Sequence, residues 1–163
     1  MAKADPPSNG AGREGPIYTA LANFFESDHW PSNPVAGRSV ISLPFQGKHG
    51  QWLCFAQARE AQQQFIFYSL CPAVVAERRR PSIAEFITRA NYGLIIGNFE
   101  LDYADGEIRY KTSIDVEGGE LTAPLIKQVV YANVLMMDQY LPGILAVLYN
   151  DSSPLEALAQ VES

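Results

Sequence analysis

Three strand-like segments between Arg38 and Leu70 constrain the fold more than any other part of the sequence. They read RSVISLPF, QWLCFAQA and QQFIFYSL, and each is rich in β-branched and aromatic residues. The connections between them are short and polar, which leaves no room for a crossover helix. The sequence therefore predicts an antiparallel, three-stranded meander. Apolar residues stand on both faces of the second segment, so we expect helices or a partner to cover part of the sheet on both sides.

Helical spacing of apolar residues flanks the meander. Before it, Pro16 begins a predicted helix that extends to about His29. After it, Ser82 and Glu85 fit a capping box, and one apolar stripe follows them along a second predicted helix. The same capping pattern recurs at residues 153–156, where a short C-terminal helix is expected.

The acidic segment 98–117 is predicted to be a hairpin with one solvated face. Phe99 and Leu101 alternate with acidic residues, as in a strand that is buried on one side only. Asp105-Gly106 supplies the residues that a two-residue hairpin turn prefers. The acids of this segment are Glu100, Asp102, Asp105, Glu107, Asp115 and Glu117.

The predicted turn also sets the register of the hairpin. It places Asp102 opposite Arg109 and Glu100 opposite Lys111, so that opposite charges meet on one exposed face. An acid/base or metal site is the alternative. A calcium loop that began at Asp102 would place Ala104 where an oxygen ligand is needed, and cationic neighbours would keep the carboxylates ionised. We therefore expect a wet hairpin face.

No pattern of catalytic or metal-ligating residues competes with this interpretation. Cys54 and Cys71 do not form a CxxC pair, and they are expected to be free, buried thiols. His29 and His49 are far apart in the sequence, although folding could bring them together. The GxGxxG match at residues 10–15 follows no strand. We expect no catalytic residue, no cofactor and no metal.

Charge and composition exclude several classes of partner. The 163-residue chain has a net charge of −6, and Arg78–Arg80 is its one basic run, which argues against nucleic acid. Residues 1–14 are polar and contain no apolar run, so we expect a flexible tail, no secretory signal and a cytoplasmic protein. Residues 15–163 are expected to form a single α+β domain.

A long C-terminal helix is predicted to begin at Thr122 and to kink or break at Pro142-Gly143. Lys127 and Asp138 interrupt its apolar surface, so we expect no membrane span. Two adjacent apolar stripes run along it. One can pack on the sheet, and the other belongs either to the core or to a homodimer interface. The candidate dimer interface consists of Val130, Val134, Met137 and Leu141.

The predicted order is helix, three strands, helix, hairpin, long helix. This order, with ANYGLIIGNFE at residues 90–100 and DGEIRY at 105–110, resembles YbjN-like proteins, the type III secretion chaperone fold and a small cyanobacterial family of uncharacterised proteins. The resemblance covers roughly residues 16–150. It implies a compact α+β domain, frequent homodimerisation and protein binding through an exposed sheet or groove, and it brings no catalytic residues.

These observations predict a non-enzymatic protein-binding or chaperone-like module. An extended client protein would add to a sheet edge and insert side chains into apolar pockets. The alternative is a small-molecule-binding regulator, or an unrecognised enzyme, with a pocket between the sheet and the helices. A long surface groove favours the first hypothesis, and a closed pocket with buried titratable groups favours the second.

Overall fold

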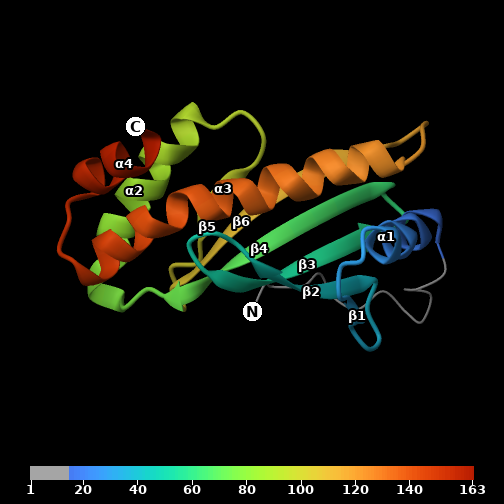
Figure 1. The fold of residues 1–163 in the computed structure, drawn as a ribbon, viewed down its shortest axis with the longest axis horizontal. Helices are drawn as coiled ribbons and strands as arrows, with labels where there is room; N and C mark the ends of the chain where they lie inside the picture. The colour runs from blue at the N-terminus through green and yellow to red at the C-terminus, as the bar shows by residue number, and fades with distance from the viewer. Residues whose placement is uncertain (1–14) are drawn as a thin grey trace.

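The structure, a computed structural model, describes residues 15–163 (Figure 1). The predicted tail, residues 1–14, lies outside the described residues, and the division of the chain at residue 15 stays a prediction. The elements are α1 (Pro16–Ser27), β1 (Asn33–Pro34), β2 (Val40–Gln46), β3 (Gln51–Arg59), β4 (Gln64–Val74), the 3₁₀ helix η1 (Glu77–Arg79), α2 (Arg80–Gly93), β5 (Asn98–Leu101), β6 (Glu107–Asp115), α3 (Ala123–Tyr149) and α4 (Pro154–Glu162).

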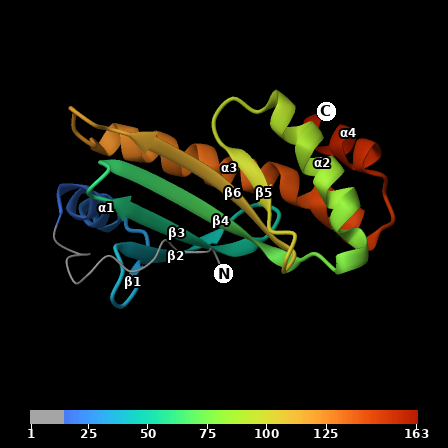
Figure 2. The same cartoon turned by 180° about the vertical axis from the view of Figure 1, so that it is seen from behind.

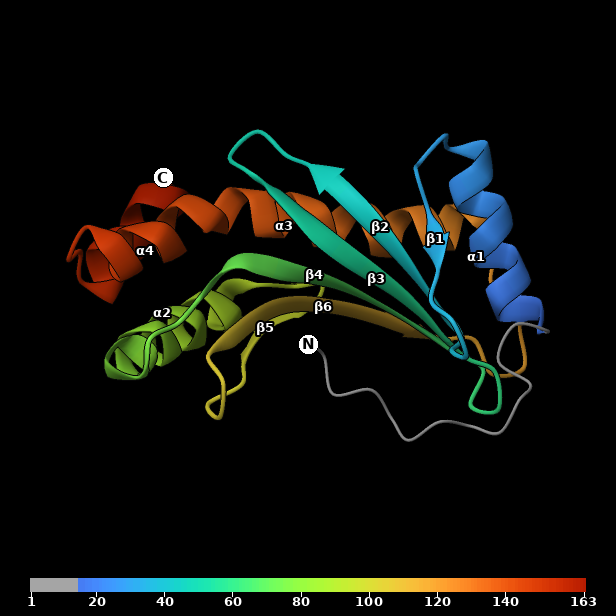
Figure 3. The same cartoon turned by 90° about the horizontal axis from the view of Figure 1, so that it is seen from below.

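The strands form one six-stranded antiparallel sheet in the order β1-β2-β3-β4-β6-β5. The predicted α+β fold, with its meander, its hairpin and its long C-terminal helix, is confirmed. β4 extends beyond the predicted segment to Val74, and the two-residue strand β1 lies in what the sequence indicated as a loop. The long strands β4 and β6 are strongly curved (Figure 3).

The helices cover only one face of the sheet. Trp52, Cys54 and Ala56 of β3 are buried and point toward them, whereas the alternate residues Leu53 and Phe55 are not buried. Figure 2 shows β3, β4 and β6 from the side away from the helices, with α3 behind the strands. Helices therefore cover one side only, and cover of the other side by a partner stays a prediction. An antiparallel sheet can keep one face in water, and this one does.

Asn133 of α3 holds the helix against the sheet. Its Nδ2 donates to the main-chain oxygens of Phe67 and Tyr110, 2.9 and 3.0 Å away, and to Oγ1 of Thr112 at 3.1 Å. Thr112 in turn donates to the main-chain oxygen of Val129 at 2.9 Å. These buried bonds set the rotation of α3 about its axis, and so decide which of its apolar stripes faces the sheet.

The four residues of the candidate dimer interface lie in the core of the single chain. Their exposed fractions are 0% for Val130, Val134 and Met137, and 1% for Leu141. Side chains that are already buried within one chain cannot line the surface of a second copy. These residues are therefore corrected to core positions, and the homodimer itself stays a prediction.

The sequence had predicted a kink or a break at Pro142-Gly143. The break does not occur, because α3 remains one helix from Ala123 to Tyr149. A proline inside a helix leaves the carbonyl four residues earlier without its donor. Here that carbonyl belongs to Asp138, and Nδ1 of His49 lies 2.9 Å from it. A group from the turn between β2 and β3 thus replaces the missing helix bond.

The two predicted capping boxes have different outcomes. The one at Ser153 and Glu156 is present, with both reciprocal bonds formed at the start of α4. The one at Ser82 and Glu85 is wrong, because η1 leads directly into α2, which begins at Arg80. Ser82 therefore lies within the first turn of the helix instead of before it.

Candidate functional site

The uncovered side of the sheet, which we call the open face, is the candidate functional site. It is formed by every second residue of β3, β4 and β6, since neighbouring residues of a strand point to opposite sides. Its apolar members are half-buried or exposed even though they belong to central strands. The open face comprises Leu53, Phe55, Gln57, Arg59, Gln64, Ile66, Tyr68, Leu70, Arg109, Lys111, Ser113 and Asp115.

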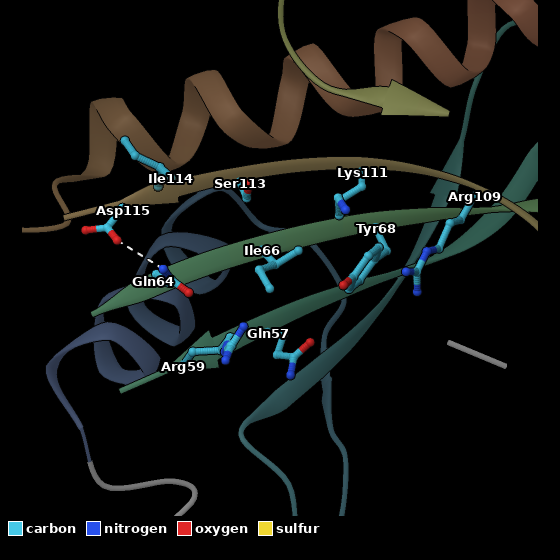
Figure 4. A pocket seen from close by; sticks show the side chains of 10 residues that line it. All are labelled: Gln57, Arg59, Gln64, Ile66, Tyr68, Arg109, Lys111, Ser113, Ile114 and Asp115. Carbon is cyan, nitrogen blue, oxygen red and sulfur yellow. Dashed lines mark hydrogen bonds between the residues drawn. The ribbon is translucent and has the colours of Figure 1, made fainter. Parts of the chain in front are cut away.

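A hollow of about 430 Å³, the central hollow, lies in the middle of the open face (Figure 4). Strand pairing brings its wall together, because Ile66 lies opposite both Gln57 on β3 and Ser113 on β6. Tyr68 lies opposite Lys111 in the next row. The residues that line it are Gln57, Arg59, Gln64, Ile66, Tyr68, Arg109, Lys111, Ser113, Ile114 and Asp115.

Glu100 of β5 holds two cations at the rim of the central hollow. Arg109 Nε donates to its Oε1 at 2.8 Å, and Lys111 Nζ donates to its Oε2 at 3.0 Å. Burial by itself raises the pKa of Glu100, but the hydrogen bond from Lys111 and the charge of Arg109 outweigh it and lower the pKa. The guanidinium of Arg109 also lies 4.4 Å from the centre of the Tyr68 ring. These contacts fix the cations in place.

The hairpin that carries these charges has a different register from the predicted one. Glu100 lies opposite Arg109, and Leu101 lies opposite Ile108, a shift of two residues. The loop is longer than two residues: Asp102 N donates to Glu107 O, and Gly106 N donates to Asp102 O. A shift of two leaves each side chain on its predicted face, so the charges still meet.

The predicted pair of Asp102 with Arg109 is therefore wrong, because Asp102 lies at the start of the loop. Its Oδ1 accepts from the main-chain N–H of Ala104 at 2.9 Å, which shapes the turn. The prediction that the charged side chains are substantially exposed is also wrong. Glu100, Arg109 and Lys111 are 30%, 22% and 31% exposed, so they lie partly within the surface.

Side chains engage main-chain groups on both sides of the sheet. At β5, Asn91 Oδ1 accepts from Phe99 N at 2.8 Å, and Asn91 Nδ2 donates to Phe99 O at 3.0 Å. At β2, Pro44 has no N–H, and its carbonyl accepts from Trp30 Nε1 at 2.7 Å. The remaining part of β2 pairs with β1. These contacts leave fewer main-chain groups for a client to pair with at the sheet edges, and the open face is the larger surface; addition of a client to an edge stays a prediction.

A second, apolar hollow of about 570 Å³ lies where β2 and β3 meet the end of α1. Three aromatic rings pack beside it, with ring centres 5.6 Å apart for Trp30 and Phe45 and 5.1 Å apart for Phe45 and Trp52. Leu53, which belongs to the open face, also lines this hollow and is 42% exposed. The apolar hollow thus continues the open face toward the edge of the sheet.

The predicted free, buried thiols are confirmed. Burial raises the pKa of Cys54 to about 12 and that of Cys71 to about 11, so both are neutral at physiological pH and poor nucleophiles. His49 is engaged with Asp138. Within residues 15–163, no group of three or more His, Cys, Asp or Glu side chains could hold a metal ion. In the same part of the chain, no helix is long and apolar enough to cross a bilayer.

Comparison with known proteins places this geometry in context. Residues 19–146 match the sequence model of the YbjN family, described as "Putative bacterial sensory transduction regulator". No curated protein matches the sequence. The fold is similar to the crystal structure of YbjN, "a putative transcription regulator from E. coli", with a TM-score of 0.59 and 13% identity over 82% of this chain and 90% of that chain.

Two further solved structures similar to this chain are complexes of two proteins. The ExsC–ExsE complex gives a TM-score of 0.52 with 15% identity, over 77% of this chain and 90% of that chain. The HopA1–SchA chaperone–effector complex gives 0.49 with 15% identity, over 73% and 88%. The predicted YbjN-like fold is confirmed, and at these identities the structural likeness concerns the fold alone.

Proposed function

The chain belongs to the YbjN family, and from this premise we propose that it is a non-enzymatic, chaperone-like module that holds an extended segment of a client protein on the open face. One observation carries the proposal. A row of large side chains, Phe55, Ile66, Tyr68 and Leu70, lies only half-buried in the centre of the sheet, on the face that no helix covers. Such surfaces on soluble proteins are typical of interaction sites.

The contacts at the edges favour one way for a client to bind. Strand addition needs a row of free main-chain N–H and C=O groups, and Asn91 and Trp30 already occupy some of those groups, at Phe99 and Pro44. A client therefore lies across the strands and makes its contacts through side chains. The ExsC–ExsE complex, a structure of similar fold, contains two proteins, which supports a protein partner for this chain.

Chaperone-like binding fits the geometry better than the small-molecule or enzymatic alternative. The central hollow is a depression in an open surface and does not lie between the sheet and the helices. The two thiols, which are the strongest nucleophiles available to the chain, are neutral and buried in the core. Free thiols also support a reducing compartment, and we propose a cytoplasmic location on that ground.

Site-specific photocrosslinking tests the proposed function. A photoreactive phenylalanine analogue replaces exposed Ser113 on the open face, and a matched variant carries it at exposed Gln128 on α3. Irradiation in native extract is expected to give discrete protein adducts from position 113 and not from position 128. Equal adducts from both positions, or none from position 113, would show that the open face is not the binding site.

A further inference from the structure

The central hollow is lined by hydrogen-bond donors that the chain itself does not use. Within residues 15–163, the hydroxyl groups of Tyr68 and Ser113 and the side-chain amide of Gln57 have no hydrogen-bond partner, and the terminal nitrogens of Arg109 have none either. Figure 4 shows these side chains around one depression. Lys111 Nζ makes one bond, to Glu100, and has further protons to donate.

The carboxylates near the hollow are already engaged. The carboxylate of Asp115 accepts from Gln64 Nε2 at 3.0 Å and from the main-chain N–H of Glu117 at 2.9 Å. The hydrogen bond from Gln64 lowers the pKa of Asp115, so this group stays ionised. Glu100 accepts from two cations. The charged groups of the hollow that keep free hydrogen-bonding capacity are thus the cationic donors Arg109 and Lys111, whereas the free hydroxyls and the Gln57 amide can donate or accept.

The charge of the hollow is opposite in sign to that of the whole chain. Arg59, Arg109 and Lys111 line it together with one carboxylate, Asp115, and Glu100 at its rim adds a second. The lining of the hollow therefore contains more cationic than anionic side chains, on a chain whose net charge is −6. A local excess of cations and free donors complements a ligand that brings anionic acceptors.

We propose that the central hollow is a carboxylate subsite, and that the client segment bound to the open face is acidic, with an Asp or Glu side chain among apolar ones. The carboxylate accepts from Arg109 and Lys111, while the neighbouring apolar side chains contact Ile66 and the ring of Tyr68. Alternate side chains of an extended segment lie about 6.8 Å apart on one side, which matches a repeat of acidic and apolar contacts along the face. This inference rests on the proposed function and names the chemistry of its partner.

The test uses three blocked peptides in which every second residue is serine, and the residues between the serines, which share one side of an extended chain, alternate between valine and glutamate, valine and glutamine, or valine and lysine. Each is labelled with a fluorophore and titrated with the full chain while its anisotropy is recorded. The glutamate peptide is expected to bind most tightly and to weaken as salt is added, and the lysine peptide is expected not to bind. Equal affinity for the glutamate and glutamine peptides would overturn the inference.

A series of charge substitutions at position 113 tests the subsite, because Ser113 is exposed and no hydrogen bond of the described chain depends on its side chain. Ser113→Lys is expected to tighten binding of the glutamate peptide and Ser113→Asp to weaken it, each by about two- to fivefold at low salt. Gln128→Lys and Gln128→Asp, at an exposed position of α3 away from the open face, are the matched controls and should leave the affinity unchanged. Affinities that do not follow the charge at position 113 would contradict a carboxylate in the hollow. So would binding of oligothymidylate in place of the peptide.

The inference and the proposed function can fail separately. If crosslinking from position 113 still captures protein while the peptides show no preference for glutamate, the open face binds clients but the carboxylate subsite is wrong. If the glutamate peptide binds and follows the charge at position 113, but crosslinking in extract gives no adduct, the subsite stands and the client-holding function is wrong.

Discussion

His49 donates from Nδ1 to the main-chain oxygen of Asp138, 2.9 Å away, which is the oxygen that Pro142 leaves without a donor inside α3. The carboxylate of the same aspartate accepts from the main-chain N–H groups of Lys48 and His49, at 3.0 and 2.8 Å. The tight turn between β2 and β3 is therefore bound to the middle of the long helix. Pro142 removes one hydrogen bond from α3, and the carbonyl that it leaves free, that of Asp138, is the acceptor through which His49 binds the turn to the helix.

Asp138→Ala is expected to lower the free energy of unfolding by about 1–3 kcal/mol, because two main-chain N–H groups lose their acceptor in a partly buried contact. Urea denaturation of the purified protein measures the change. Gln128→Ala, an exposed change on the same helix, is the control and should stay within about 0.5 kcal/mol. Equal effects of the two variants would contradict this account of the turn.

Val134→Asp and Leu135→Asp distinguish core from surface at adjacent positions of α3. Val134 is 0% exposed and Leu135 is 57% exposed. We expect Val134→Asp to lower the free energy of unfolding by about 4 kcal/mol or more and to unfold the chain, since it buries an unpaired charge. Leu135→Asp should lower the free energy of unfolding by about 1 kcal/mol or less. Circular dichroism measures both outcomes, and a folded, monomeric Val134→Asp variant would contradict the core assignment.

The homodimer is tested by light scattering of the unmodified protein at micromolar concentration. We expect the mass of a dimer, in keeping with the family resemblance. A monomer mass would remove the homodimer from the proposal without affecting the open face.

Glu100→Gln is expected to lower stability in a pH-dependent way. The pKa of Glu100 in the folded chain lies below its ordinary value of 4.5, so its ion pairs stabilise the folded state above that pH. The stabilisation is lost as the pH falls through the lowered pKa. We therefore expect the wild-type chain to be more stable than the variant by about 1 kcal/mol or less at neutral pH, with the difference vanishing in acid.

Thermal unfolding between neutral and acidic pH measures this difference. Glu85→Gln, which removes an exposed pair with Arg89 on α2, is the matched control and should have the smaller effect. A difference that grows on acidification would show that the sign is wrong.

The thiols of Cys54 and Cys71 are expected to resist modification in the folded protein. Burial raises the pKa of Cys54 to about 12 and that of Cys71 to about 11, so the thiolate fraction at neutral pH is very small. An aromatic disulfide reagent should react slowly with native protein and rapidly in denaturant. Fast reaction of either thiol under native conditions would contradict the buried, neutral assignment.

The sequence predicted the parts of the fold that depend on local periodicity. The meander, the long helix that begins after Thr122 and the acidic hairpin all follow from residue patterns within single segments and from the short connections between neighbouring segments. The register of the hairpin did not, because Asp105-Gly106 fits more than one loop length and both registers bring Glu100 near cations. In the loop of this hairpin, Gly106 alone has a left-handed conformation, with φ +80°, whereas the predicted two-residue turn needs two such residues.

What the sequence could not predict depends on contacts between distant segments. The inward stripe of α3 is chosen by the bonds of Asn133 to strands 66 and 23 positions away in the sequence. The open face could be recognised only once every helix was known to lie on the other side. The donors of the central hollow come from three strands, so no local sequence motif could predict that they lie together.

At β5, the side-chain amide of Asn91 bonds to the N–H and C=O of Phe99, as the main chain of a neighbouring strand would. At β2, Pro44 has no N–H, and its carbonyl accepts from Trp30 Nε1. Contacts on both sides of the sheet thus leave fewer free main-chain groups for a further strand, which lowers the tendency of copies of this chain to join edge to edge.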